Sequence, residues 1–489
     1  MRSALWISLS VGLLGLATGV HAATLYVNNT GSPSCSDGTA KASNTANAPW
    51  CTIQRAAKGH ANPATPNASE AASAGDLVLV TAGTYTESGT ITGSCGSTGR
   101  YTAILDPVNS GTTGNPITFR GVGTVAVRAT DNHYGPILGW LNHDYIVWDH
   151  FYVDEQYLHT CDDTGSVVLW GGTGGQLINS TIIGDSQWTA DNHNGIRTEY
   201  CDTCTIKNNS ISNVWDSGGT NRNAAGIMTY STTNIVIEHN DITDTVTGIY
   251  LKHNISPYGG AIVRFNVVRN ALMTGMEIHR QDGADVYQNI VRTEYTGGAD
   301  TYGILLLHFD ATTSPDNIDV VNNTIDGWDT GFGAGLTNGG TGNRFYNNIV
   351  TYNGVGIGGD PLSGWSDNAV LDLEHNLYYG NTNISYIGST LRNLATYQSA
   401  TGQDAVSPAA SGSDPLFVDR TAANFRLQGS SPAAALGVDI LDLDGDASTS
   451  DSIPAGAYIT GTETIGLEVA SGSTVISGGM SWSGGVRIQ

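Results

Sequence analysis

A short unit of the form Gly-apolar-x-apolar-x recurs through the middle of the chain at spacings of 22 to 31 residues. A second strand-like stretch follows each unit and ends on an asparagine, at spacings of 23 to 34 residues. The units begin at Gly195, Gly226, Gly248, Gly275, Gly303, Gly331 and Gly356, and the asparagines are Asn209, Asn240, Asn266, Asn289, Asn323, Asn348 and Asn376. Short alternating strands separated by Gly, Asn and Asp turns, at this period, are typical of one coil of a parallel β-helix.

The competing solenoid is the leucine-rich repeat, but its Leu-x-x-Leu-x-Leu pattern is missing here. Glycine makes up 63 of the 489 residues and charged residues only 13%, which also disfavours a helical protein. A chain of this length would otherwise divide into several domains. The sequence therefore predicts an all-β, single-stranded β-helix, and we expect the repeated asparagines to form a hydrogen-bonded ladder at a turn.

The beginning of the chain reads as an export signal. Residues 1–22 combine a basic start at Arg2, an apolar stretch over residues 5–16 and the cleavage-site sequence Val20-His21-Ala22. No later stretch is apolar for long enough to cross a bilayer. We therefore expect a secreted, periplasmic or extracellular protein without a membrane span, which is a monomer by default.

The mature chain divides into four predicted regions. Residues 23–130 form an N-terminal cap and the first coils, with a short capping helix over residues 50–57, and residues 131–400 form the central coils. Residues 401–460 are expected to close the solenoid, because a solenoid core must be covered at its ends. Residues 461–489 form a Gly/Ser-rich tail.

Six cysteines in an exported chain are an even set and suggest disulfides. Their proximity in sequence favours the pairs Cys35–Cys51 and Cys201–Cys204. The spacing Cys201-Asp-Thr-Cys204 is also that of a redox motif or of half a zinc site. A second such spacing is missing and the compartment is oxidising, so we predict structural disulfides.

The charge balance constrains the partners. The chain has 20 Lys and Arg against 44 Asp and Glu, and removal of Arg2 with the signal leaves 19 − 44 = −25. A field of this sign disfavours nucleic acid as a partner. It also repels polyanionic sugars, so a polyuronate would need a local basic cluster or a bound cation.

The outward positions of the repeated units carry an unusual concentration of titratable side chains. Side chains alternate across a strand, so the x positions of successive units face solvent. These positions hold Arg197 and Glu199, Met228 and Tyr230, Tyr250 and Lys252, Glu277 and His279, and Leu305 and Leu307, with His253 and Arg280 at the strand ends. Since coils lie about 4.8 Å apart, we expect Tyr230, Lys252 and His279 to stand side by side. The alternative is a solvated face on which Lys252 pairs with Glu277.

The flanking stretches carry a family resemblance. Residues 74–80, 83–85 and 116–119 near the beginning and residues 414–417 and 456–458 near the end resemble those of secreted right-handed β-helix proteins. This class includes pectate lyases, alginate lyases and chondroitinases. The resemblance covers roughly residues 25 to 458, and it implies a right-handed helix and action on an extracellular polysaccharide.

Two strands resemble a narrower family, that of chondroitinase B and related alginate lyases. Residues 249–254 look like the strand that bears its catalytic lysine, here Lys252, and residues 276–280 look like the strand that bears an arginine. His279 occupies the arginine position, with Arg280 one place further on. Thr245 and Thr247 replace the calcium-binding acids of the family, and Asp241 and Asp244 are the remaining candidates for a calcium site.

The cluster suits β-elimination from a uronate, which requires a cation on the carboxylate, a base and an acid. Lys252 is the candidate base if His279 and Arg280 lower its pKa, and Arg280 would hold the carboxylate. The candidate acids are Tyr250, Tyr230 and His279. The candidate substrate-binding residues are Arg197, Glu199, Tyr230, Glu277 and His253.

Two alternatives remain at this point. A glycoside hydrolase needs two carboxyl groups about 5 to 9.5 Å apart, whereas Glu199 and Glu277 are three coils, or about 14 Å, apart. A hydrolase would have to pair Glu277 with Asp282, Asp310 or another loop acid. The second alternative is a non-catalytic surface or adhesive protein that binds glycans along the same groove. Four tryptophans are either stacking or packing residues, namely Trp148, Trp170, Trp188 and Trp215.

Overall fold

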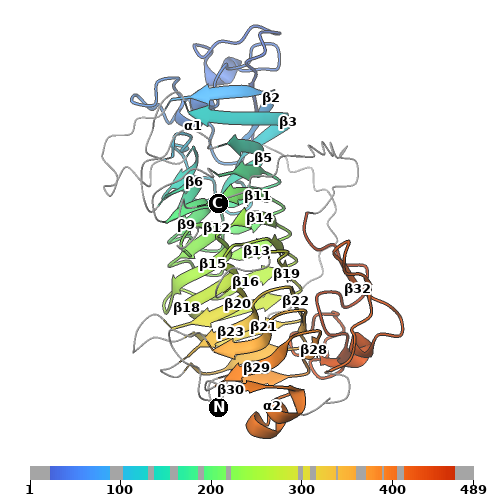
Figure 1. The fold of residues 1–489 in the computed structure, drawn as a ribbon. Coiled ribbons are helices and arrows are strands. Elements are labelled where there is room, and N and C mark those ends of the chain that lie inside the picture. Colours follow the sequence, from blue (N-terminus) through green and yellow to red (C-terminus); the bar gives the residue numbers. More distant parts are fainter. Residues whose placement is uncertain are drawn as a thin grey trace, which may run out of the picture.

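The computed structural model describes residues 22–88, 103–129, 137–154, 164–184, 192–215, 222–295, 301–308, 315–336, 340–359, 371–387, 390–404 and 412–467. Most of this chain forms short parallel strands with little helix, stacked along one axis (Figure 1). Nearly all of the predicted signal peptide lies outside the described residues, as does the tail beyond Leu467.

The strands form three parallel ladders, to which each coil contributes in turn. Ladder one contains β7 (Gln176–Ile178), β10 (Thr205–Lys207), β13 (Val236–Glu238), β16 (Ala261–Arg264), the second half of β18 (Thr274–Tyr287), β21 (Asp316–Val321), β24 (Asn343–Tyr346) and β27 (Leu371–Glu374). Ladder two contains β8 (Thr181–Ile183), β11 (Ser210–Val214), β14 (Asp241–Thr245), β17 (Val267–Arg269), β19 (Ile290–Arg292), β22 (Thr324–Asp326), β25 (Ile349–Thr351) and β28 (Leu377–Tyr379).

Ladder three carries the predicted Gly-apolar-x-apolar-x units. It contains β4 (Leu138–Leu141), β6 (Thr164–Trp170), β9 (His193–Glu199), β12 (Ala225–Tyr230), β15 (Thr247–Asn254), the first half of β18, β20 (Tyr302–Leu307), β23 (Thr330–Gly335), β26 (Val355–Gly359) and β29 (Asn383–Ile387). The prediction of a parallel solenoid of strands is confirmed.

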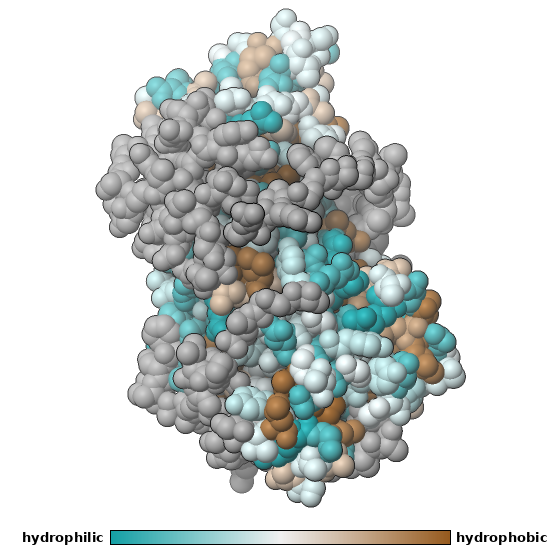
Figure 2. Space-filling model, in the orientation of Figure 1, coloured by the Kyte–Doolittle hydropathy of each residue, from teal (hydrophilic) through white to brown (hydrophobic). Residues whose placement is uncertain are grey.

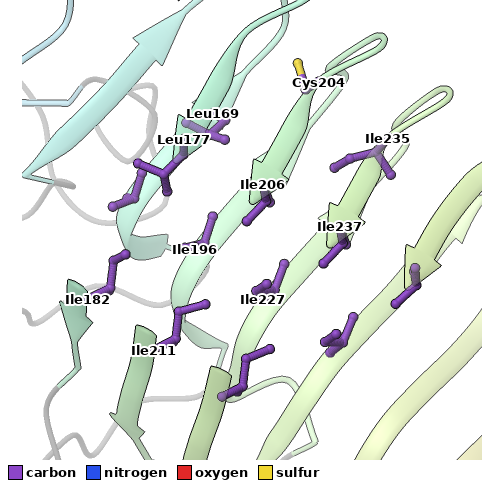
Figure 3. Close-up of a cluster of buried hydrophobic side chains, with 14 of the residues drawn as sticks. Leu169, Leu177, Ile182, Ile196, Cys204, Ile206, Ile211, Ile227, Ile235 and Ile237 are labelled. Carbon is purple, nitrogen blue, oxygen red and sulfur yellow. The ribbon is translucent and has the colours of Figure 1, made fainter. Parts of the chain in front are cut away.

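The core is a set of stacks, in which each coil places an equivalent apolar side chain above the next. Ile196, Ile227 and Ile249 are in register on ladder three, and Ile206 and Ile237 are in register on ladder one. All are buried, and Figure 3 shows the labelled isoleucines pointing into the interior from both sides. Similar side chains repeated at one coil spacing can pack closely against one another, as a protein interior requires.

The recurrent glycine of the repeat is explained by space. A Cβ atom on Gly248 would lie 2.3 Å from Cγ1 of Val268 and 2.5 Å from the carbonyl oxygen of Gly275. On Gly275 it would lie 2.3 Å from Cγ1 of Val291 and 2.6 Å from the carbonyl oxygen of Gly303. Each glycine therefore lets ladder three approach the core side chains of ladder two.

The predicted asparagine ladder is confirmed at the turn between ladders one and two. Each of the seven repeated asparagines donates its side-chain N–H to the side-chain oxygen of the next residue in the stack, over 2.9 to 3.1 Å. The last acceptor is Asp404, whose buried carboxylate also accepts from the hydroxyl of Tyr378. The stack satisfies buried backbone and side-chain groups together, as a buried polar network must.

The N-terminal strands β1 (Thr24–Val27), β2 (Leu77–Glu87), β3 (Ile117–Ala129) and β5 (Ile146–Asp154) pair in parallel, and β5 leads into β7 and β8. The short helix α1 (Ile53–Lys58) buries Ile53, Ala56 and Ala57 in the same core. The hydroxyl of Thr52 accepts a hydrogen bond from the backbone N–H of Arg55, which is an N-cap.

At the other end, β30 (Thr390–Arg392) turns back antiparallel to β29, and α2 (Leu394–Thr401) inserts Tyr397 into the core. Residues 412–467 differ from the closing coils expected of residues 401–460. Their strands β31 (Phe417–Asp419), β32 (Asn424–Leu427), β33 (Gly437–Val438) and β34 (Ser452–Ile453) form two small antiparallel sheets outside the three ladders.

This C-terminal segment runs back along the outside of the helix, beside ladder two (Figure 1). Phe417, Phe425 and Tyr458 form an apolar cluster with Ile349 and Leu377 of β25 and β28. Ile349 and Leu377 form an apolar strip on the outer surface of ladder two. Because an exposed apolar surface is unfavourable in water, the C-terminal segment packs on this strip and does not form a further coil. Within the coloured part of Figure 2, the hydrophobic residues lie in small groups among hydrophilic ones.

Both predicted disulfides are present, Cys35–Cys51 and Cys201–Cys204. The second pair lies at the turn after β9, and both of its cysteines are fully buried, as expected of a structural bond. Disulfides fit an extracytoplasmic location. Among the described residues, every helix is too short or too polar to cross a membrane.

Candidate functional site

The outward side chains of ladder three form two rows that run along the helix axis. In the first row, Arg197 lies beside Met228, then Tyr250, Glu277 and Leu305. In the second, Glu199 lies beside Tyr230, then Lys252, His279 and Leu307. The predicted neighbours Tyr230, Lys252 and His279 are therefore confirmed as neighbours on successive coils, because each pair is directly in register.

A third row lies one residue after the second row, beyond the ends of β9 and β12 and within β15 and β18. Tyr200, Ser231, His253 and Arg280 are equivalent residues of four successive coils, and all have left-handed backbone conformations with φ between 52° and 56°. The next residues, such as Asn254 and Gln281, turn inward and hydrogen-bond to one another at 2.8 Å. His253 thus lies at the end of β15, as predicted, whereas Arg280 lies in the interior of β18, between its two halves.

Two hydrogen-bonded aromatic pairs link the rows. The hydroxyl of Tyr250 is 2.6 Å from Nδ1 of His279, and the hydroxyl of Tyr230 is 3.0 Å from Nδ1 of His253. The rings of His253 and His279 are 5.8 Å apart. Lys252 lies between the pairs, with its Nζ 5.4 Å from the centre of the Tyr250 ring. Groups that can donate or accept protons thus form one contiguous cluster.

A segment just before β12 brings in two residues that the sequence reasoning missed. Nζ of Lys252 donates to Oδ1 of Asn223 at 2.5 Å. The guanidinium of Arg222 lies 3.8 Å from the carboxylate of Glu277 and 5.6 Å from the centre of the Tyr302 ring. The only signal in the sequence was that both residues precede a repeated unit. The reach of Asn223 across one coil, and of Arg222 across two and three coils, could not be predicted from it.

Burial sets the protonation of the Tyr250–His279 pair. Burial, with the adjacent Glu277 carboxylate, raises the pKa of Tyr250 well above its usual value, and the charge of Arg222 acts in the opposite direction. Burial, with the positive charges of His253 and Lys252, lowers the pKa of His279 to about 3. Near neutral pH the pair therefore consists of a neutral phenol and a neutral imidazole. A neutral imidazole can accept a proton and a neutral phenol can donate one.

The carboxylates of the cluster are paired with arginines. Arg197 donates through Nε to Glu199, and the two side chains are 6% and 3% exposed. Glu277 is 2% exposed and faces Arg222, with its carboxylate also 3.8 Å from Nδ1 of His279. These acids therefore serve to hold cations in place, and direct contact of Arg197 and Glu199 with substrate stays a prediction.

The residues considered for calcium do not fit a calcium site. Asp241 accepts two hydrogen bonds from Nη2 of Arg269, at 2.6 and 2.7 Å, which occupies both carboxylate oxygens. Asp244 accepts from the hydroxyl of Tyr295 at 3.4 Å. Within the described ranges, the acids close enough together to share a cation lie in the loop of Asp439, Asp442, Asp444, Asp446 and Asp451, away from ladder three.

Comparison with known proteins agrees with the fold. Residues 158–350 match the family described as "Right handed beta helix region". The structure is similar to that of pectate lyase Pel9A, with a TM-score of 0.52 and 13% sequence identity over 90% of this chain and 96% of that one. A stack of parallel coils with this match is a right-handed parallel β-helix. The matched region and this structural similarity therefore show the fold of a right-handed β-helix.

Two further solved structures are more distant. The catalytic unit of a GH87 α-1,3-glucanase from Streptomyces thermodiastaticus strain HF3-3 has a TM-score of 0.43 and 13% identity, over 66% of this chain and 62% of that one. The A-module of Azotobacter vinelandii mannuronan C-5 epimerase AlgE4 has a TM-score of 0.38 and 11% identity, over 63% and 84%. No curated protein matches the sequence significantly. These likenesses concern the fold alone.

Proposed function

We propose that the protein is a secreted carbohydrate-active enzyme that cleaves an anionic, uronate-containing polysaccharide by β-elimination. The observation that carries the proposal is the row of Tyr230, Lys252 and His279 on three successive coils, flanked by His253 and Arg280. Two hydrogen-bonded Tyr–His pairs complete this cluster of proton donors and acceptors.

The distribution of charge supports an anionic substrate. The chain has only 20 Lys and Arg and a net charge of −24, so its overall field repels polyanions. Four cations nevertheless gather on the outer face of ladder three or at its edge, namely Arg197, Arg222, Lys252 and Arg280. Glu199 and Glu277, the acids paired with Arg197 and Arg222, balance only two of these four charges. Such a local group of cations is what a polyuronate needs to overcome the field of the whole protein.

The reaction assigns one role to each group. Arg280 binds the uronate carboxylate and neutralises its charge, and Lys252, in its neutral form, takes the proton on the adjacent carbon. The electron pair of that C–H bond forms a carbon–carbon double bond, while the glycosidic C–O bond at the next carbon breaks. The leaving oxygen takes a proton from a neutral phenol, for which Tyr230 and Tyr250 are the candidates. His279, which the sequence also offered as an acid, is left out of this role because its pKa is lowered to about 3 and it carries no proton to donate near neutral pH.

The arrangement of acids favours elimination over hydrolysis. A hydrolase needs two carboxyl groups, one of which must be free to attack or to activate water. Glu199 and Glu277 are three strands apart on the ladder and are buried beside Arg197 and Arg222. In the rows between them stand Met228, Tyr230, Tyr250 and Lys252. We therefore rank a glycoside hydrolase and a non-catalytic glycan-binding protein below a lyase.

The location and the N-terminal end complete the proposal. An export signal at residues 1–22 together with the two disulfides supports secretion. We also propose that α1 covers the N-terminal end of the core, because its buried face packs with β1 and β2 residues there. No step of the proposed reaction passes through calcium.

The proposal is tested by ultraviolet absorbance of the purified protein with alginate, pectate and chondroitin, with and without calcium. Elimination leaves an unsaturated uronate, so absorbance rises on at least one polymer and Lys252→Ala abolishes the rise. Lys207→Ala is the matched control, because Lys207 lies on ladder one in an ion pair with Glu238. Absence of any rise, or an equal rise with Lys252→Ala, overturns the proposal.

A further inference from the structure

A group of aromatic side chains lies on the N-terminal side of the proposed catalytic cluster. The ring of Tyr200 packs edge-on against Trp170, with centres 5.0 Å apart, and against Tyr258, with centres 6.0 Å apart. Trp170 lies directly beside Glu199 on ladder three, and Tyr200 follows Glu199 at the turn. Tyr258 reaches the group from the loop after β15. We call Trp170, Tyr200 and Tyr258 the aromatic platform.

Tyr200 is exposed in spite of these contacts. Its side chain is 44% exposed, while its two ring contacts fix its position. A large apolar ring held at the surface in this way loses little conformational entropy when a ligand covers it. The platform therefore has the form of a preorganised binding surface rather than that of a packing defect.

The platform is continuous with the proposed catalytic cluster. Four equivalent residues of successive coils have a left-handed backbone conformation, namely Tyr200, Ser231, His253 and Arg280. They form one row parallel to the helix axis, which we call the turn row. The backbone N–H of Tyr200 donates to the carbonyl of Tyr230 at 3.1 Å. With a coil spacing of about 4.8 Å, Tyr200 stands roughly 10 Å from His253 along the axis. An extended oligosaccharide that lies along the turn row can contact both.

The chemistry of the row changes along its length. At one end Arg280 and His253 suit a carboxylate and polar hydroxyls. At the other end Tyr200, with Trp170 and Tyr258 at its sides, presents an apolar aromatic face beside the buried and ion-paired Glu199. A pyranose ring has an apolar face of C–H groups that complements such a surface, and its edge hydroxyls can bond to a phenol.

We propose that the aromatic platform is a sugar subsite, in which Tyr200 stacks on a pyranose ring of the polysaccharide two coils away from the sugar bound at Lys252. The proposal rests on the proposed function, because it takes the same chain as ligand. The subsite would add to the specificity of the protein. It would favour polysaccharide chains long enough to reach Tyr200 and sugars that present an apolar ring face, whatever their charge. Short oligosaccharides that end near Lys252 do not gain from it.

The proposal is tested by binding alone, in a Lys252→Ala background that prevents turnover. Affinity electrophoresis is run in gels that contain alginate, pectate, chondroitin, xylan or β-glucan. At least one polymer retards the parent, and Tyr200→Ala weakens that retardation about tenfold, whereas Tyr200→Phe keeps most of it because the ring remains. Tyr295→Ala is the matched control, since Tyr295 is 43% exposed but follows β19 of ladder two, where its hydroxyl contacts Asp244.

The outcomes separate this subsite from the proposed reaction. Equal binding by Tyr200→Ala and its parent, equal weakening by Tyr295→Ala, or no retardation by any polymer overturns the subsite. Melting temperatures of the variants show whether a loss of binding comes from unfolding. If a polymer binds through Tyr200 but the intact protein forms no unsaturated product, the subsite stands and the lyase proposal fails. If the intact protein forms unsaturated product and Tyr200→Ala has an unchanged KM, the lyase proposal stands and the subsite fails.

Discussion

Two faces of the same β-helix carry clusters of charged residues, and the residues that stand beside these charges on the next coil differ between the two faces. On ladder one, opposite charges stand next to one another: Lys207, Glu238 and Arg264 are in register on three coils, with ion pairs of 3.0 and 2.7 Å. Asp319 and Arg344 form a further pair at 2.5 Å. On ladder three, the neighbours of Lys252 in its row are Tyr230 and His279. We call these the ion-pair face and the site face.

The difference shows how one repeated fold can carry stabilising ion pairs on one face and a candidate reactive site on another. Each of the five charged residues named on the ion-pair face has an opposite charge one coil away, so their charges largely cancel. On the site face the lysine is next to neutral proton carriers, and the acids are withdrawn into pairs with Arg197 and Arg222. The net charge of the whole chain is −24, but in the described rows of ladder three Arg197, Lys252 and Arg280 outnumber Glu199 and Glu277.

The largest expected effect separates the two lysines. Lys252→Ala should lower kcat/KM on the polyuronate by about 10²- to 10⁴-fold, because it removes the proposed base. Lys207→Ala should leave kcat/KM unchanged, because its ion pair is part of the ion-pair face. Steady-state absorbance kinetics measure both. Equal losses in the two variants would show that the faces do not differ in function.

A smaller effect separates two tyrosines. Tyr250→Phe removes the hydroxyl bonded to His279 and should lower kcat by about tenfold, the equivalent of one hydrogen bond. Tyr287→Phe removes a hydroxyl that accepts from Arg264 at 2.9 Å and should leave kcat unchanged. Steady-state absorbance kinetics compare the kcat of the two variants, and melting temperatures show whether either variant is unfolded. An unchanged kcat in Tyr250→Phe would exclude Tyr250 from the reaction.

On the ion-pair face the expected loss is one of stability. Arg344→Met leaves the half-buried Asp319 without its cation and should lower the free energy of unfolding by about 1–2 kcal/mol. The activity of the folded protein should not change. Adding Asp319→Asn to the same chain should recover part of the loss, which urea denaturation can measure. A fall in kcat with full stability would assign Arg344 to the site instead.

The last expected effect is a pH dependence of the stability. Burial, with the charge of Asp319 one coil away, raises the pKa of Asp285 to about 6 from its ordinary 3.8. The contribution of Asp285 to stability is therefore present below pH 3.8 and is lost as the pH rises through about 6. Asp285→Asn should melt at a higher temperature than the parent above this pH, and the difference should shrink at lower pH. A difference that is independent of pH would contradict the assignment.

Much of the fold could be predicted because its causes repeat along the chain. Glycines at the strand starts are required by the close approach of ladders two and three, and the asparagines by the buried stack that they form. Both therefore recur with the coil period. The register on ladder three followed from this period, so the positions of Tyr230, Lys252 and His279 relative to one another could be predicted.

What could not be predicted depends on contacts that do not repeat. Arg222 and Asn223 reach the site from a segment whose path is set by tertiary packing. Residues 412–467 look like strands and turns, and only the apolar outer strip of ladder two shows why they pack beside the helix. Asp241 and Asp244 look like metal ligands in sequence, but Arg269 and Tyr295 contact them in the structure.

The central claim is that the site face breaks the glycosidic bond by elimination, without water entering the product. Mass spectrometry of oligosaccharides produced from a polyuronate in oxygen-18 water tests it most directly. The account predicts unsaturated products that carry no oxygen-18, and none of these products from Lys252→Ala. Saturated products with one oxygen-18 at the new reducing end would show hydrolysis and would contradict the account.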